Sequence, residues 1–148
     1  MYMVSACLVG ISCRYDGKNT LDEKLLELLR EGKAIPLCPE LLGGLPTPRE
    51  SCEIVTAEDG TRRVMGRSGA DFTNAYREGA RKTLEICKIA NIKKAILQDR
   101  SPSCGYGRIY DGTHTGGFAE GNGITADLLI KNGIEVFTRA AWGKGKED

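Results

Sequence analysis

The segment YMVSACLVG, Tyr2–Gly10, contains the pattern that decides the fold. Its first four residues are short and apolar enough to form a buried β-strand, and Cys7 follows them at once. A second strand is predicted at Ala34–Leu37, although Pro36 weakens that prediction because proline cannot donate a hydrogen bond to a sheet. The same order, an apolar strand and then a cysteine, recurs twice along the chain: Ala34–Leu37 before Cys38, and Ala95–Leu97 before Cys104.

Helices are expected between these strands. Thr20 and Glu23 have the spacing of a capping box, in which each side chain bonds the backbone N–H of the other residue. Gly32 is a stop signal for the helix that follows. Four leucines place one apolar stripe on this helix: Leu21, Leu25, Leu28 and Leu29.

The second half of the chain continues the alternation. A long helix is predicted from about Asp71 to Ala90, with Ser68 or Asp71 as its cap. A short helix over Thr125–Lys131 and a final strand over Ile134–Thr138 follow. The apolar face of the long helix comprises Phe72, Tyr76, Ala80, Leu84 and Cys87.

Strands that alternate with helices predict an α/β fold: a mostly parallel, Rossmann-like sheet with helices on both faces in three layers. One β-hairpin excursion is expected around Asp59-Gly60, between strands at Ile54–Thr56 and Arg62–Met65. The turn-rich segments are interpreted as shaped loops, and the tail as frayed. These segments are Cys38–Ser51, Ser101–Gly123 and the tail Gly143–Asp148.

Length and composition restrict the function. The 148 residues suit one domain spanning 1–148, and the net charge of +1 gives no strong signal for nucleic-acid binding. No apolar run is long enough for a membrane helix, and the N-terminus is a poor signal peptide. We therefore expect a cytoplasmic protein, in which six cysteines are catalytic, metal-binding or core residues rather than disulfides. A homodimer is compatible with the sequence.

Parallel strands end at the same edge of a sheet, where α/β proteins bind ligands, so Cys7, Cys38 and Cys104 are expected to meet there. Converging thiolates suit zinc or an iron–sulfur cluster. The chain lacks the C-x2–4-C pairs of structural zinc sites, and its one histidine is His114. The alternative is that these thiols are small core residues, and spacing alone leaves both interpretations open.

Other side chains near these cysteines have two interpretations each. Cys87 is expected in the core, Cys52 is expected to have no role, and Cys13 lies near enough to Cys7 to approach the same site. The polar residues could move protons, position water or hold an anion, or they could be ordinary capping and surface groups. They are Arg14, Asp16, Glu40, Arg49, Ser101, Ser103 and His114.

Four segments together resemble the domain-of-unknown-function 523 family, whose characterised members are thiouracil desulfidases. The similarity runs in order through nearly the whole chain. The segments are SACLVGISCRYDG (Ser5–Gly17), CPELLGGLPTPR (Cys38–Arg49), SPSCG (Ser101–Gly105) and IYDGTHTGGFAEGNGITADLL (Ile109–Leu129).

The resemblance implies an α/β fold and an oxygen-sensitive 4Fe–4S cluster held by three cysteines, whose open iron takes the sulfur of a thiolated pyrimidine while water replaces it. By motif, the implied ligands are Cys7, Cys38 and Cys104. The implied polar groups that position water and move protons are Glu40, Ser101 and Ser103. Cys13 and Cys52 depart from the family pattern.

The expected function is therefore a cluster-dependent desulfidase that acts on a thiolated nucleobase or nucleoside and releases sulfide. Glu40 would serve as the base if burial raised its pKa. A flat ring could stack on Tyr15, Tyr106 or Tyr110. Two alternatives are a non-catalytic cluster- or metal-binding module that handles sulfur, and a cluster-free enzyme with a reactive thiol.

Overall fold

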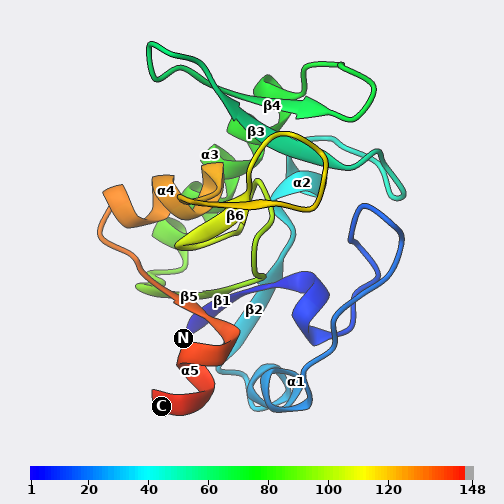
Figure 1. The fold of residues 1–148 in the computed structure, drawn as a ribbon. Coiled ribbons are helices and arrows are strands. Elements are labelled where there is room, and N and C mark those ends of the chain that lie inside the picture. The colour runs from blue at the N-terminus through cyan, green and yellow to red at the C-terminus, as the bar shows by residue number, and fades with distance from the viewer. Residues whose placement is uncertain (146–148) are drawn as a thin grey trace.

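The computed structural model describes residues 1–145. Its centre is a four-stranded sheet in the order β2-β1-β5-β8, with all neighbouring strands parallel (Figure 1). The predicted parallel sheet is confirmed. The strands are β1 (Tyr2–Ser5), β2 (Ala34–Leu37), β5 (Lys94–Leu97) and β8 (Glu135–Thr138).

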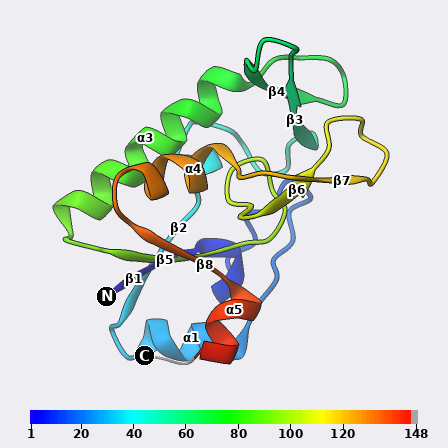
Figure 2. The same ribbon diagram turned by 60° about the vertical axis from the view of Figure 1, so that its left-hand side comes forward.

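Helices cover both faces of this sheet, as predicted (Figure 2). Because successive side chains of a strand point to opposite faces, each strand contributes to two cores. Met3 packs with residues of α3 and α4, whereas Val4 packs with residues of α1 and α5. The helices are α1 (Glu23–Arg30), α3 (Thr73–Ile89), α4 (Ile124–Lys131) and α5 (Arg139–Gly145).

Two antiparallel hairpins stand outside the parallel sheet. The predicted hairpin is formed by β3 (Cys52–Thr56) and β4 (Arg62–Gly66). A second hairpin, β6 (Arg108–Tyr110) with β7 (Phe118–Glu120), lies in a segment that the glycine content led us to predict as a loop. Pro36 is tolerated because β2 is an edge strand that pairs only with β1.

The predicted capping box at the first helix is wrong. The helix begins after Asp22, whose carboxylate accepts hydrogen bonds from the backbone N–H groups of Lys24 and Leu25. Thr20 instead donates its backbone N–H to the carbonyl of Cys7, and its hydroxyl accepts a hydrogen bond from Gln98. Thr20 therefore connects the ends of β1 and β5 rather than capping α1.

Two single-turn elements were missed. A 3-10 helix, η1 (Ala6–Val9), follows β1, and α2 (Pro39–Leu42) begins inside the predicted loop after β2. Both are single turns, too short for a periodic pattern to predict them. Residues Gly143–Gly145 of the tail, predicted to be frayed, belong to α5, and 146–148 lie outside the described residues.

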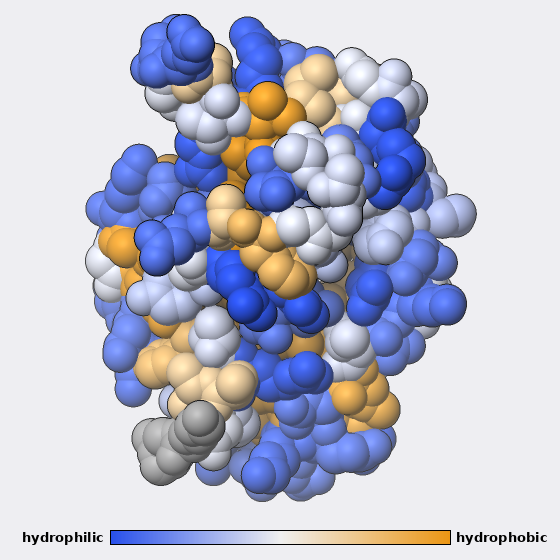
Figure 3. All heavy atoms as spheres, viewed as in Figure 1, coloured by the Kyte–Doolittle hydropathy of each residue, from blue (hydrophilic) through white to orange (hydrophobic). Residues whose placement is uncertain are grey.

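Hydrophilic residues cover most of the face shown in Figure 3, and apolar residues form small separate patches on it. Among residues 1–145, no helix combines the length and apolar character needed to cross a membrane.

Candidate functional site

A pocket of about 290 Å³ lies at the carboxyl edge of the sheet. Its wall includes the segments that follow β1, β2 and β5, together with residues of β3 and the β6–β7 hairpin. The chain leaves β1 toward β2 on one side and reaches β5 on the other, so the strand order reverses between β1 and β5. Such a switch point is where open α/β sheets bind ligands.

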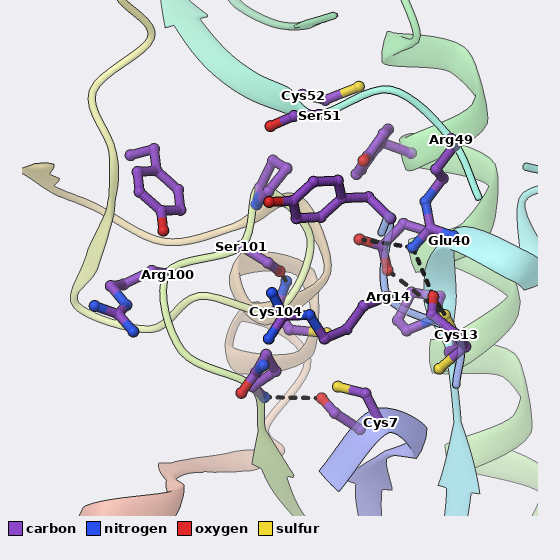
Figure 4. A pocket seen from close by; sticks show the side chains of 18 of the residues that line it. Cys7, Cys13, Arg14, Glu40, Arg49, Ser51, Cys52, Arg100, Ser101 and Cys104 are labelled. Atoms are coloured by element: carbon purple, nitrogen blue, oxygen red, sulfur yellow. Dashed lines mark hydrogen bonds and ion pairs between the residues drawn. The ribbon is translucent and has the colours of Figure 1, made fainter. Parts of the chain in front are cut away.

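The structure brings the three strand-end cysteines together in this pocket. Figure 4 labels two of them, Cys7 and Cys104. Cys7 lies in η1 directly after β1, Cys38 precedes α2 as its N-cap residue, and Cys104 lies in the turn after β5. Cys7 and Cys104 are buried, and Cys38 is half-buried. Because the parallel strands end at the same edge of the sheet, three thiols that are far apart in sequence surround one pocket.

Cys38 is positioned by an unusually close contact between α2 and α3. A Cβ atom at Gly79 would lie 2.0 Å from the carbonyl oxygen of Pro39, and one at Gly43 would lie 2.1 Å from that of Ala75. These distances are far below van der Waals contact, so only glycine allows the two helices to meet here. The pair thereby sets the place of α2, with Cys38 at its start.

Cys104 is positioned by a turn that α4 caps. The Ser101 hydroxyl accepts hydrogen bonds from the backbone N–H groups of Ser103 (3.2 Å) and Cys104 (2.7 Å). The first N–H groups of α4 in turn donate to carbonyls of the same turn, Ile124 to Pro102 and Thr125 to Ser103. The helix start and the cysteine turn therefore stabilise each other.

Cys13 is a fourth thiol in the pocket wall, as its spacing from Cys7 indicated. Hydrogen bonding to Cys13 is the main influence that lowers the pKa of both Cys7 and Cys38, against the opposing effect of burial. The pKa of Cys13 itself is raised by the same hydrogen bonds, first to Cys38 and then to Cys7. Cys7 and Cys38 are thus the thiols of this trio that favour the thiolate.

Cys104 differs from them, because burial raises its pKa, and the nearby charges of Glu40, Cys7 and Cys38 act in the same direction. Desolvation therefore disfavours the Cys104 thiolate. An ion or cluster that binds to the sulfur would supply a compensating positive charge.

Glu40 is buried in the pocket wall beside Cys38. Its Oε1 accepts a hydrogen bond from Cys38 Sγ at 3.7 Å, and its Oε2 lies 3.8 Å from Nη2 of Arg49. Burial raises the pKa of Glu40, while the Arg49 charge opposes this rise. The Arg49 guanidinium also donates to the Cys13 carbonyl oxygen at 3.0 Å (Figure 4). This carboxyl is therefore held in place, and its raised pKa makes it a better proton acceptor than an exposed glutamate.

Ser101 and Ser103, both predicted site residues, are separated by the fold. Ser101 lines the pocket, and since its oxygen already accepts two backbone N–H groups, its own hydrogen is free to donate into the space. Ser103 is buried away from the pocket wall. Its hydroxyl bonds that of Thr125 at 2.8 Å, and Cys104 Sγ lies 4.0 Å away.

Of the other candidate residues, some line the pocket and some lie outside it. Asp16 forms an ion pair with Arg14 but does not line the pocket itself. His114 and Tyr106 do not line the pocket either. Tyr15, Tyr110, Arg14 and Arg49 line the pocket as candidates for holding a ring or an anion. Cys87 is fully buried in the sheet–helix core, as predicted. Cys52, which we expected to have no role, is a buried part of the pocket wall.

Glu53 and Tyr76 are among the pocket residues that were not predicted from the sequence. Glu53 is buried on β3, where its Oε1 accepts the backbone N–H groups of Gly112 and His114 and so ties the β6–β7 loop to the first hairpin. Tyr76 lies on the apolar face of α3, so the periodicity of the helix predicts it in the core and gives no sign that it also lines the pocket. No local signal marks either residue.

The donor set fits an iron–sulfur cluster better than a single metal ion. Within residues 1–145, no group of three or more His, Cys, Asp or Glu side chains is close enough to hold one ion. A cluster spreads its iron atoms and takes one thiolate at each, so its ligands surround the group instead of meeting at a point. The three strand-end thiols around a 290 Å³ pocket, with no histidine in its wall, match that requirement.

Comparison with known proteins agrees with this geometry. Residues 2–141 match the 2-thiouracil desulfurase family. The uncharacterized protein YbbK of Bacillus subtilis (strain 168) is 48% identical over 143 residues, 93% of this chain and 95% of that protein. A solved structure of the [4Fe-4S]-dependent thiouracil desulfidase TudS is 41% identical, with a TM-score of 0.88 over 97% of this chain and 93% of that one.

Proposed function

The chain belongs to the 2-thiouracil desulfurase family, and on that premise we propose that it is a [4Fe-4S]-dependent thiouracil desulfidase. The observation that most supports the proposal is the convergence of the strand-end cysteines on one pocket that also contains the buried Glu40. The overall reaction replaces sulfur by oxygen: the thiocarbonyl compound and water give the carbonyl compound and hydrogen sulfide. We also propose that it acts in the cytoplasm, where its six free cysteines stay reduced.

Cys7, Cys38 and Cys104 would hold the cluster, with thiolates favoured at Cys7 and Cys38. A bound cluster with one iron free of protein ligands would supply a soft Lewis acid that polarises the carbon–sulfur bond. Tyr15 and Tyr110 lie in the wall where a flat ring can stack.

Glu40 and Ser101 would direct the water. The Ser101 hydroxyl can donate to the water oxygen, since the backbone already fills its acceptor sites. A Glu40 carboxylate oxygen takes the proton as the water attacks the ring carbon, and burial, opposed by the Arg49 charge, raises its pKa in the direction that a general base needs. Ser103 would support this arrangement indirectly, through its bond to Thr125 below Cys104.

The test is turnover by protein reconstituted anaerobically with iron and sulfide. With 2-thiouracil, we expect equal amounts of uracil and sulfide to appear over many turnovers. Bound iron and sulfide without turnover of any thiopyrimidine would favour the non-catalytic binding module instead. Full turnover in the presence of an iron chelator, without a cluster, would favour the reactive thiol.

A further inference from the structure

The pocket has two chemically different ends. Cys7 and Cys104 lie at one end, and Ser51 and Cys52 lie at the other (Figure 4). Tyr76 reaches this end of the pocket from α3, and the Cys52 thiol beside it donates to the Glu50 carbonyl oxygen at 3.6 Å. Both side chains are buried, with 3% of Tyr76 and 7% of Cys52 exposed, and both line the pocket.

The Tyr76 hydroxyl is not needed for packing. Its ring belongs to the apolar cluster under the first hairpin, together with Ile54, Val64 and Ile109, where a phenylalanine ring would pack equally well. Burying a hydroxyl costs free energy unless it is well bonded, and a thiol is a weak partner. A polar group placed in this wall at such a cost suggests a ligand that completes its hydrogen bonds.

The chemistry of the pair restricts that ligand to a neutral polar group. Burial raises the pKa of Tyr76 far above its usual range and that of Cys52 to about 11, so both side chains stay protonated at neutral pH. A neutral hydroxyl next to a neutral thiol can donate its hydrogen to a carbonyl oxygen of a ligand. Neither group attracts a cation or a phosphate.

We infer that Tyr76 and Cys52 form a subsite for the oxo group of the pyrimidine ring, the exocyclic group that lies two ring positions from the thiocarbonyl whose sulfur is removed. This inference rests on the proposed function. A ring anchored at its oxo group would present its thiocarbonyl to the cysteine end. Tyr76 is then a substrate-binding residue that distinguishes thiopyrimidines by their second exocyclic group, with Cys52 as its neighbour in the pocket wall.

The test is Tyr76→Phe, which removes one oxygen atom and keeps the ring. We expect KM for 2-thiouracil to rise about 3- to 10-fold, as for the loss of one hydrogen bond, with kcat and iron content unchanged. The Kd of the product uracil should rise by a similar factor. Tyr2→Phe is the matched control, because Tyr2 is also buried but lies in the core with Trp142, outside the pocket wall, and this variant should behave as wild type.

Unchanged KM and uracil affinity in Tyr76→Phe would overturn the subsite, as would a lower kcat with less iron, which would indicate a structural role. The proposed function fails separately, if reconstituted wild type releases no sulfide from 2-thiouracil. In that case, weaker uracil binding by Tyr76→Phe would still support the subsite.

Discussion

Cys13 shows how much of the site depends on one side chain that is not a proposed ligand. Its thiol lowers the pKa of both Cys7 and Cys38, and its carbonyl oxygen accepts hydrogen bonds from Arg49 at 3.0 Å and from the Cys38 thiol at 3.9 Å. The sequence indicated that it could approach Cys7, but its position between two ligands depends on the loop from Ile11 to Lys18. That loop is closed by the bond from the Arg14 N–H to the Lys18 carbonyl, which no pattern predicts.

Cys13→Ala should raise the pKa of Cys38 in the cluster-free protein, because its thiolate loses the hydrogen bond that lowers this pKa most. The alkylation rate of the half-buried Cys38 by iodoacetamide, followed against pH by peptide mass spectrometry, should have its midpoint at a higher pH than in wild type. An unchanged midpoint would contradict the assigned hydrogen bond.

Glu40→Gln tests the proposed base while keeping the shape of the side chain. We expect kcat for 2-thiouracil to fall about 10²- to 10⁴-fold, the usual contribution of a general base, with iron and sulfide content as in wild type. Because Gln can keep a neutral hydrogen bond to Arg49, the fold should survive. Near-normal kcat at full cluster content would assign the proton transfer to another group.

At the scale of elements, the glycine contact between α2 and α3 controls where Cys38 lies. Gly79→Ala would place a methyl group 2.0 Å from the Pro39 carbonyl oxygen, so the helices must separate. We expect the free energy of unfolding to fall by about 1–3 kcal/mol, because overpacking exceeds the better helix propensity of alanine. Urea unfolding of the reduced, cluster-free protein measures this loss.

Gly143→Ala is the matched control. Gly143 lies in α5, where an added Cβ meets nothing within 4 Å, so alanine should stabilise the protein by about 0.5–1 kcal/mol through helix propensity. A Gly79→Ala variant as stable as this control would show that α2 and α3 tolerate separation and do not fix Cys38.

The elements differ in how well the sequence predicts them, and the reason is length. The 17-residue α3 gives several turns of periodic apolar residues, so its span and its buried face were predicted closely. The four-residue helices η1 and α2 give one turn each. At α1, Thr20 and Asp22 both have cap-forming side chains, and tertiary bonds to Cys7 and Gln98 decide which of them caps the helix.

At the scale of the whole molecule, the parallel sheet explains why the site could be predicted in outline. Once three strands are parallel, their carboxyl ends must share an edge, and Cys7, Cys38 and Cys104 follow those ends. The opposite wall could not be predicted. It comes from the hairpins and from α3, where Glu53 and Tyr76 have the apolar neighbours of ordinary core positions.

Counting iron and sulfide after anaerobic reconstitution is the decisive measurement of whether Cys7, Cys38 and Cys104 hold one cluster. Wild type should bind about four irons and four sulfides per chain. Each of Cys7→Ala, Cys38→Ala and Cys104→Ala should lose most of them, whereas Cys87→Ala, which removes a core thiol outside the pocket, should retain them. Wild type without bound iron, or full clusters in all three ligand variants, would contradict the account.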